Sequence, residues 1–219
     1  MHQKTIISLC CATASFCFGA VAVAADTANG WYAGGNVGQS RAKVDGAGIN
    51  AAVLATGTVA TAATSTNEND TGFKLFAGYR FHPNFAVEGG YFNLGKFGFT
   101  TVTTGPAATL NGTAKSENGF NLDLVGILPL NESFSLLARV GAQTSKTTLS
   151  LGGVGPGGTT SISSSQTSGS YKAGLGAQYD FTKSIGARAE WERYRVPGGA
   201  SGSSKADVDL FSLGVVVKF

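Results

Sequence analysis

The sequence predicts an all-β fold, an eight-stranded antiparallel up-and-down transmembrane β-barrel with three short periplasmic turns and four long extracellular loops. Segments of about ten residues alternate apolar with polar side chains, which is typical of strands that meet two different environments. Their connections alternate between tight turns and long segments, a pattern typical of bacterial outer-membrane barrels. After the N-terminal segment, no uninterrupted apolar run reaches the length of a membrane helix.

The composition fits one all-β domain and excludes two other classes of protein. Charged residues make up 13% of the 219 residues, and glycine contributes 32. So few charges, together with repeated short strands, exclude a disordered chain. The formal net charge is +3, and no run of Lys or Arg forms a patch for nucleic acid. Nucleic acid is therefore not an expected partner.

Residues 1–24 are predicted to form a cleaved signal peptide, which leaves 25–219 as the barrel. Lys4 supplies a basic start, and Thr5–Val23 is apolar and uncharged. Small residues then provide a cleavage site after Ala24 or Ala25. An uncleaved anchor is the alternative, since the apolar run is long enough to cross a bilayer. The small residues at its end favour cleavage.

All the cysteines lie inside this predicted signal peptide, at Cys10, Cys11 and Cys17. Phe16 is too bulky for a lipoprotein cleavage site before Cys17, so we expect no lipid anchor. The mature chain then has no thiol. This excludes disulfides, thiolate metal sites and a cysteine nucleophile.

The clearest strands form the hairpin Gly72–Leu94, which turns at His82–Asn84. One face of its first strand is wholly apolar, and the other face carries two charges, Lys74 and Arg80. The same alternation recurs in six further segments, which are Trp31–Ser40, Gly119–Leu128, Phe134–Gln143, Tyr171–Phe181, Ile185–Glu192 and Phe211–Phe219. Together they predict eight strands.

The predicted connections fall into two classes. The short ones are His82–Asn84, Asn131–Ser133 and Thr182–Ser184. The long ones are rich in Gly, Ala, Ser and Thr, and are Arg41–Thr71, Lys96–Asn118, Ser145–Ser170 and Arg193–Ala206. Alternation in Gly98–Thr104 and Thr147–Gly152 predicts that some strands continue above the bilayer. Asn50–Ala63 fits either a short helix or a sheet flap.

A β-sheet in lipid must close on itself, because every backbone polar group there has to be paired internally. Eight strands enclose an interior that side chains can fill. Aromatic residues near the short turns fit an interfacial girdle, and the predicted members are Trp31, Phe81, Phe85, Phe134 and Phe181.

The inward face carries six basic and five acidic side chains, at Lys74, Arg80, Glu88, Asp123, Arg139, Lys172, Asp180, Arg188, Glu190, Glu192 and Lys218. Buried charges are tolerated when they are paired and hydrogen-bonded. We therefore predict a lumen charge network that plugs the barrel. The alternative is a narrow pore whose charges select ions.

The sequence offers little for catalysis. The mature chain has a single histidine, His82, in a short turn on the periplasmic side. With no cysteine, neither a zinc site nor an activated nucleophile is expected. Glu190 and Glu192 share the lumen face with compensating basic residues, and Gly152–Gly158 lacks the Lys-Ser/Thr ending of a phosphate loop. We predict no enzyme activity, cofactor or metal.

The chain resembles the OmpA-like transmembrane β-barrel family of Gram-negative bacteria. The resemblance covers all eight predicted strands and rests on three motifs, which are Gly30-Trp31-Tyr32-Ala33-Gly34, the hairpin strands Gly72–Phe81 and Phe85–Phe92, and Val215-Val216-Val217-Lys218-Phe219. It implies an outer-membrane location, with contacts to membrane lipid and lipopolysaccharide. Many members add a peptidoglycan-binding domain. This sequence ends at the eighth strand, so that tether is expected to be missing.

The resemblance also implies a role for the last strand. Its outward residues resemble the C-terminal signal read by the barrel-assembly machinery, and are Phe211, Leu213, Val215, Val217 and Phe219. The resulting hypothesis is a small, monomeric, non-enzymatic membrane protein that serves envelope integrity, surface recognition or adhesion through its loops. The alternative is a narrow porin-like channel for ions or small solutes.

Overall fold

The computed structural model describes residues 29–43, 45–198 and 204–219. The predicted signal peptide and its cysteines lie outside these ranges. The elements in order are β1 (Gly30–Ala42), α1 (Gly46–Leu54), β2 (Thr61–Asn67), β3 (Asn69–His82), β4 (Phe85–Asn93), β5 (Lys96–Thr104), β6 (Ala108–Pro129), β7 (Phe134–Gly155), β8 (Gly158–Asp180), β9 (Ile185–Gly198) and β10 (Ser204–Lys218).

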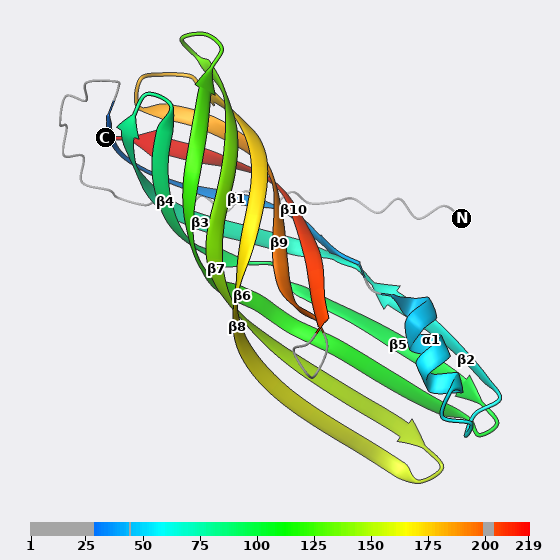
Figure 1. Ribbon diagram of the computed structural model, residues 1–219. Helices are drawn as coiled ribbons and strands as arrows, with labels where there is room; N and C mark the ends of the chain where they lie inside the picture. The colour runs from blue at the N-terminus through cyan, green and yellow to red at the C-terminus, as the bar shows by residue number, and fades with distance from the viewer. Residues whose placement is uncertain (1–28, 44, 199–203) are drawn as a thin grey trace, which may run out of the picture.

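Eight of these strands close into a barrel. Around the ring they run β1-β3-β4-β6-β7-β8-β9-β10, and β10 pairs back onto β1. Every neighbouring pair is antiparallel; at the closure, for example, Ala33 lies opposite Ala77 on one side and Val217 on the other. The predicted eight-stranded antiparallel barrel is confirmed (Figure 1).

The three short connections lie where the sequence predicts them. In the turn before β7, the Asn131 side-chain oxygen accepts the backbone N–H groups of Ser133 and Phe134. In the turn before β9, the Thr182 hydroxyl accepts those of Ser184 and Ile185. Each side chain thus satisfies donors that the strand ladder leaves unpaired.

Alternation along each strand separates two faces. Large apolar side chains point outward around the whole ring; Leu213, for example, is 68% exposed. Polar and charged side chains point into the barrel and are buried. An apolar exterior around a polar interior is the arrangement that lipid requires of a barrel.

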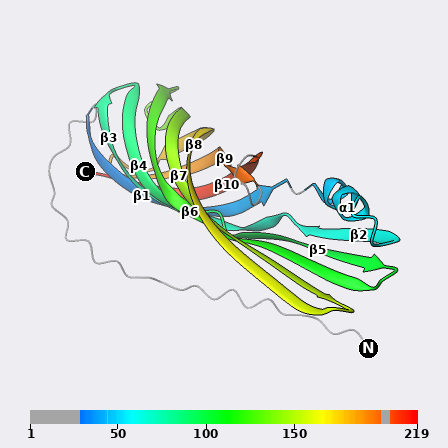
Figure 2. The same cartoon turned by 60° about the horizontal axis from the view of Figure 1, so that its bottom comes forward.

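Much of the long external connections forms strands that extend the sheet beyond the ring. β6, β7 and β8 continue beyond the ring, β5 pairs with the outer part of β6, and β2 pairs with β5. We call this assembly of β2, β5 and the outer parts of β6, β7 and β8 the external sheet (Figures 1 and 2). The predicted continuation at Gly98–Thr104 and Thr147–Gly152 is confirmed.

The first long connection, Arg41–Thr71, contains both a short helix and a strand, the two alternatives that the sequence left open. Its helix α1 begins after Asp45, whose carboxylate accepts the Gly48 N–H and so caps the first turn. A turn at 55–60 leads into β2, which lies beside α1. None of the helical segments in the described ranges has the length and hydropathy needed to cross a bilayer.

Candidate functional site: the barrel interior

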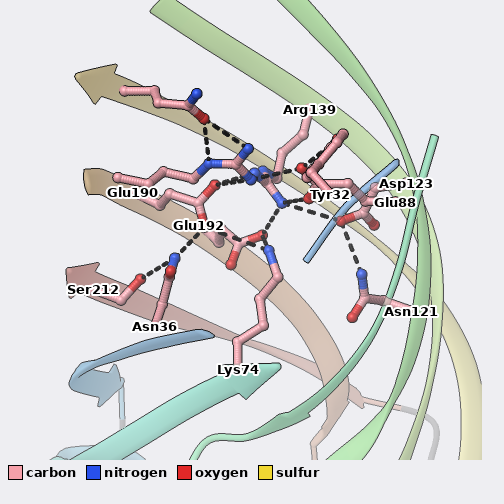
Figure 3. Close-up of polar contacts among 12 residues, drawn as sticks. Tyr32, Asn36, Lys74, Glu88, Asn121, Asp123, Arg139, Glu190, Glu192 and Ser212 are labelled. Atoms are coloured by element: carbon pink, nitrogen blue, oxygen red, sulfur yellow. Dashed lines mark hydrogen bonds and ion pairs between the residues drawn. The ribbon is translucent and has the colours of Figure 1, made fainter. Parts of the chain in front are cut away.

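The middle of the barrel holds four basic and four acidic side chains, which we call the charge cluster. Their net charge is zero, and they come from six neighbouring strands: Lys74 on β3, Glu88 on β4, Asp123 on β6, Arg139 on β7, Lys172 on β8, and Arg188, Glu190 and Glu192 on β9. In Figure 3 the side chains of Lys74, Glu88, Asp123, Arg139, Glu190 and Glu192 converge in the lumen.

Arg139 connects the carboxylates of the charge cluster. Its Nη1 lies 2.8 Å from Glu88 Oε2, 3.4 Å from Glu192 Oε1 and 3.5 Å from Asp123 Oδ2. Its Nη2 donates to Glu190 Oε1. One guanidinium thus contacts carboxylates from three strands, which its planar set of five donors allows.

The two lysines approach Glu192 from opposite sides of the lumen. Lys74 Nζ lies 3.0 Å from Glu192 Oε1, and Lys172 Nζ lies 2.5 Å from the same oxygen. Lys172 also contacts Asp123 Oδ2 at 2.8 Å. The cluster therefore joins strands that are not neighbours in the ring.

Arg188 extends the cluster toward the periplasmic end. Its Nη1 lies 2.6 Å from Glu88 Oε1, while its Nε and Nη2 donate to Gln178 Oε1 at 3.1 and 2.9 Å. The guanidinium also lies 4.7 Å from the centre of the Phe76 ring, within the range of a cation–π interaction.

Several neutral partners of the cluster were missed by the sequence analysis. Tyr32 donates to Glu88 Oε1 at 2.9 Å, Asn36 to Glu190 Oε2 at 2.5 Å and Tyr194 to Glu192 Oε2 at 3.0 Å. The alternation of inward and outward side chains along each strand could have identified these partners. Tyr32 and Asn36 alternate with the outward residues of β1, and Tyr194 with those of β9.

Pairing accounts for the stability of so many charges away from water. The side chains of the cluster are at most 3% exposed. A charge this buried costs several kcal/mol unless an opposite charge and hydrogen bonds compensate it. Each of the eight has an opposite charge within 3.5 Å.

Apolar side chains fill the lumen on both sides of the charge cluster. The external apolar layer consists of Ala42, Phe92, Leu94, Phe97, Tyr194, Val196, Val208 and Leu210. The periplasmic apolar layer consists of Tyr32, Phe76, Ala86, Val125, Leu137 and Val216. All of these residues are buried. Along the axis, an apolar cluster therefore lies on each side of the charge cluster, and the external one also holds buried polar residues such as Ser40.

Three of the predicted inward charges lie apart from the charge cluster, so the prediction of one network of eleven is corrected. Arg80 donates to the backbone carbonyl of Pro83 in the periplasmic turn. Asp180 and Lys218 form a separate, partly exposed ion pair. All three, together with Arg188 of the charge cluster, line a cavity of about 620 Å³ at the periplasmic mouth. The alternation along a strand predicts that these side chains point inward. It does not predict how far along the barrel axis each of them lies.

The five predicted interfacial aromatics lie at the periplasmic end of the outer surface. Trp31 contacts Tyr79 with ring centres 5.1 Å apart, and Phe181 contacts Tyr179 at 5.3 Å. A second aromatic group surrounds the external end, with Phe73–Tyr91, Tyr91–Phe120 and Trp191–Phe211 contacts. The sequence analysis missed this group. Two aromatic belts about one apolar band are typical of a membrane-spanning barrel.

The residues considered for catalysis are occupied by structural contacts. Glu190 and Glu192 belong to the charge cluster, and His82 Nδ1 accepts the Asn84 N–H in its turn. Across the described ranges, no three His, Cys, Asp or Glu side chains are placed to hold a metal ion.

Comparison with known families agrees with this geometry. The family described as the outer membrane protein beta-barrel domain matches residues 8–219. The chain belongs to this family. It is accordingly a protein of the bacterial outer membrane, and the resemblance noted in the sequence is confirmed.

Comparison with solved structures gives matches with TM-scores below 0.5. Ail, the attachment invasion locus protein of Yersinia pestis, is 19% identical, with a TM-score of 0.48 over 87% of this chain and 99% of that chain. Neisserial surface protein A is 16% identical, with a TM-score of 0.46 over 86% and 97%. OprG of Pseudomonas aeruginosa is 14% identical, with a TM-score of 0.43 over 88% and 96%. Comparison with curated protein sequences gave no match.

Proposed function

We propose that this outer-membrane barrel is a closed, non-enzymatic support that holds the external sheet at the cell surface for recognition or adhesion. The observation that supports the proposal is the filling of the barrel interior by side chains. A neutral charge cluster lies in the middle of the lumen, and buried apolar residues pack on each side of it. The barrel anchors the sheet, and the sheet supplies the contacts.

Physical reasons favour a closed lumen over a channel. A permeating ion needs water or polar ligands along its whole path, and an apolar constriction blocks conduction by excluding water. Buried side chains occupy both apolar layers, among them Phe92 and Leu210 on the external side and Phe76 and Val216 on the periplasmic side. Between them, the cluster's cations and carboxylates are already paired with each other.

The same contacts support a non-enzymatic role. An acid–base pair needs a carboxylate that can reach a substrate, whereas Glu190 and Glu192 are buried and each lies against basic side chains. His82 is the last residue of β3, next to the short turn at the end opposite the external sheet.

Single-channel recording tests the proposal. The refolded protein in planar lipid bilayers is expected to give no stable conductance steps over a range of voltages. An established porin, inserted under the same conditions, serves as the positive control. Reproducible unitary steps from this protein would overturn the closed barrel and favour a narrow channel.

A variant with smaller side chains in the external apolar layer makes the test more specific. Phe92→Ala and Leu210→Ala together remove two large side chains from the external apolar layer and leave the charge cluster in place. We expect this variant to remain non-conducting, because the charge cluster and the periplasmic layer still fill the lumen. Conductance steps seen with this variant but not with the wild-type protein would show that the external apolar layer alone closes the lumen.

A further inference from the structure

The outer part of β8 forms an edge of the external sheet. Gly158–Thr167 pairs with β7 on one side, from Gly155 opposite Gly158 to Lys146 opposite Thr167. On its other side, β8 meets β9 only from Lys172 onward. Within the described ranges, Gly158–Thr167 therefore has one neighbouring strand. Figures 1 and 2 show the β7–β8 hairpin projecting away from the ring, as do β2, β5 and the outer part of β6.

This edge lacks the features that normally prevent a strand from pairing with another chain. An unpaired edge presents a row of backbone donors and acceptors, which proteins usually protect with Lys, Pro or a bulge. Gly158–Thr167 reads Gly-Thr-Thr-Ser-Ile-Ser-Ser-Ser-Gln-Thr, with no charge and no proline. All ten residues are exposed, and their register with β7 runs without a shift.

The segment is nevertheless built as a regular strand. Hydroxyl pairs connect it to β7 across the sheet, Thr148 with Ser165 at 2.9 Å and Ser150 with Ser163 at 3.4 Å. These contacts fix the pairing on the β7 side, and no strand in the described ranges pairs with the opposite edge. The strand is thus preformed, which reduces the conformational entropy that a binding partner would have to overcome.

We propose that this edge pairs antiparallel with the same edge of a second copy of the protein, so that two external sheets join through their β8 strands. The inference rests on the proposed function and names the partner of the external sheet. Two identical surfaces related by a two-fold axis form a closed, self-complementary contact. Strand addition of this kind draws its affinity from backbone hydrogen bonds.

The side chains of the edge favour a second copy as the partner. Like charges that face each other across two strands destabilise the pair, and an uncharged edge avoids this when it meets itself. The segment has one large apolar side chain, Ile162, which is 64% exposed and lies opposite Leu151 on β7. Placing Ile162 opposite Ile162 of the second copy would join both Ile–Leu pairs into one apolar strip.

The direction of the strands indicates where the two copies lie. In an antiparallel pair formed by the same edge, the two barrels lie at opposite ends of the joined strands. β8 runs from the hairpin tip toward the membrane, so copies that face each other from two membranes meet this condition. Ten residues of strand reach about 33 Å. The proposed contact is therefore homophilic and joins neighbouring cells.

Disulfide cross-linking tests the register. The predicted mature chain has no cysteine, so Ile162→Cys introduces a single thiol. At the two-fold axis, the two thiols lie within disulfide distance. In the matched control Ser165→Cys, the two thiols lie about 20 Å apart along the joined strands. Oxidation of proteoliposomes is expected to cross-link the first variant at least tenfold more than the second. Equal cross-linking, or none at Ile162→Cys, would overturn the pairing.

Vesicle clustering tests whether the contact joins two membranes. Proteoliposomes of the wild-type protein are expected to cluster, and Ser161→Lys with Ser163→Lys is expected to abolish clustering by placing four lysines together at the axis. The control, Ala55→Lys with Thr58→Lys, adds the same charge at the exposed turn between α1 and β2 and is expected to cluster normally. A heat-modifiability gel verifies that each variant is folded.

These results separate the strand pairing from the proposed function. Wild-type vesicles that stay dispersed, or edge-lysine vesicles that still cluster, would overturn the homophilic contact and leave the closed barrel standing. Conductance steps would overturn the closed barrel and leave the cross-linking result standing.

Discussion

Arg139 shows how a single side chain organises the interior of this barrel. It contacts four carboxylates, and its own side chain is 1% exposed. Because the carboxylates come from β4, β6 and β9, the residue ties the two sides of the lumen together. Strand parity predicts that Arg139 points inward. It does not predict these partners, because they are set by the depth of each residue along the tilted strands.

Removing this cation should be costly. Arg139→Met keeps an unbranched, flexible side chain but removes the charge, which leaves Glu88 and Glu190 with fewer opposite charges in a buried site. We expect a loss of about 3–5 kcal/mol in the free energy of unfolding, measured by urea titration of the refolded protein in lipid vesicles. Lys218→Met, which breaks the partly exposed pair with Asp180, is the control and should cost about 1 kcal/mol or less. Equal losses would contradict the central role of Arg139.

The lipid face can be tested at the same scale. Leu124 points outward near the middle of the apolar band and is 46% exposed. Leu124→Arg should cost about 2–4 kcal/mol, because a charge at the midplane loses its hydration. Leu128→Arg, near the periplasmic turn, should cost about 0–1 kcal/mol in the same vesicle assay. Unchanged stability of Leu124→Arg would contradict the assignment of Leu124 to the lipid-facing side of the barrel.

At the scale of elements, the membrane-spanning strands are predictable and the external sheet is only partly so. In the spanning strands, large apolar residues alternate with charges, and the period of two is unmistakable. In the outer part of β8 nearly every residue is Ser, Thr or Gly, so both faces look alike and the segment resembles a loop. Hairpin pairing with β7 makes it a strand, and the alternation of side chains within β8 alone does not carry that information.

Close approach between strands explains why some glycines cannot be replaced. A Cβ added at Gly38 would lie 1.8 Å from the carbonyl oxygen of Phe211, and backbone atoms cannot easily move. At Gly89 the nearest atom would be 4.0 Å away. We expect Gly38→Ala to cost about 1–3 kcal/mol through overpacking and Gly89→Ala to have a much smaller effect. Urea titration of both variants in vesicles measures the change in the free energy of unfolding. A loss for Gly38→Ala as small as that for Gly89→Ala would show that β1 and β10 can separate at little cost.

At the scale of the whole molecule, closure of the barrel follows from the sequence, whereas the filling of its lumen does not. Eight amphipathic strands in lipid have to close, since an open edge there would leave backbone groups unpaired. The apolar layers above and below the charge cluster depend on which inward residues share a depth. Phe92, Tyr194 and Leu210 meet across the lumen, although they come from β4, β9 and β10.

The last strand closes the ring, and its role in assembly is a prediction. Phe219 points outward at the periplasmic end, and its N–H donates to the Trp31 carbonyl. We expect Phe219→Ala to reduce the amount of folded barrel in isolated outer membranes several-fold, while its urea stability after refolding stays close to wild type. Phe181→Ala removes another exposed aromatic at the same end and should assemble normally. Equal assembly of both variants would contradict a C-terminal signal.

The length of β7 has a mechanical consequence. This strand runs from Phe134 at the periplasmic turn to Gly155 at the hairpin tip, 22 residues without an interruption. It is paired with β8 along its whole length and with β6 along most of it. A pull on the tip directed along the strand therefore loads many backbone hydrogen bonds in shear at the same time. Tension applied outside the cell would reach the membrane-embedded barrel directly, with no hinge in this strand to absorb it.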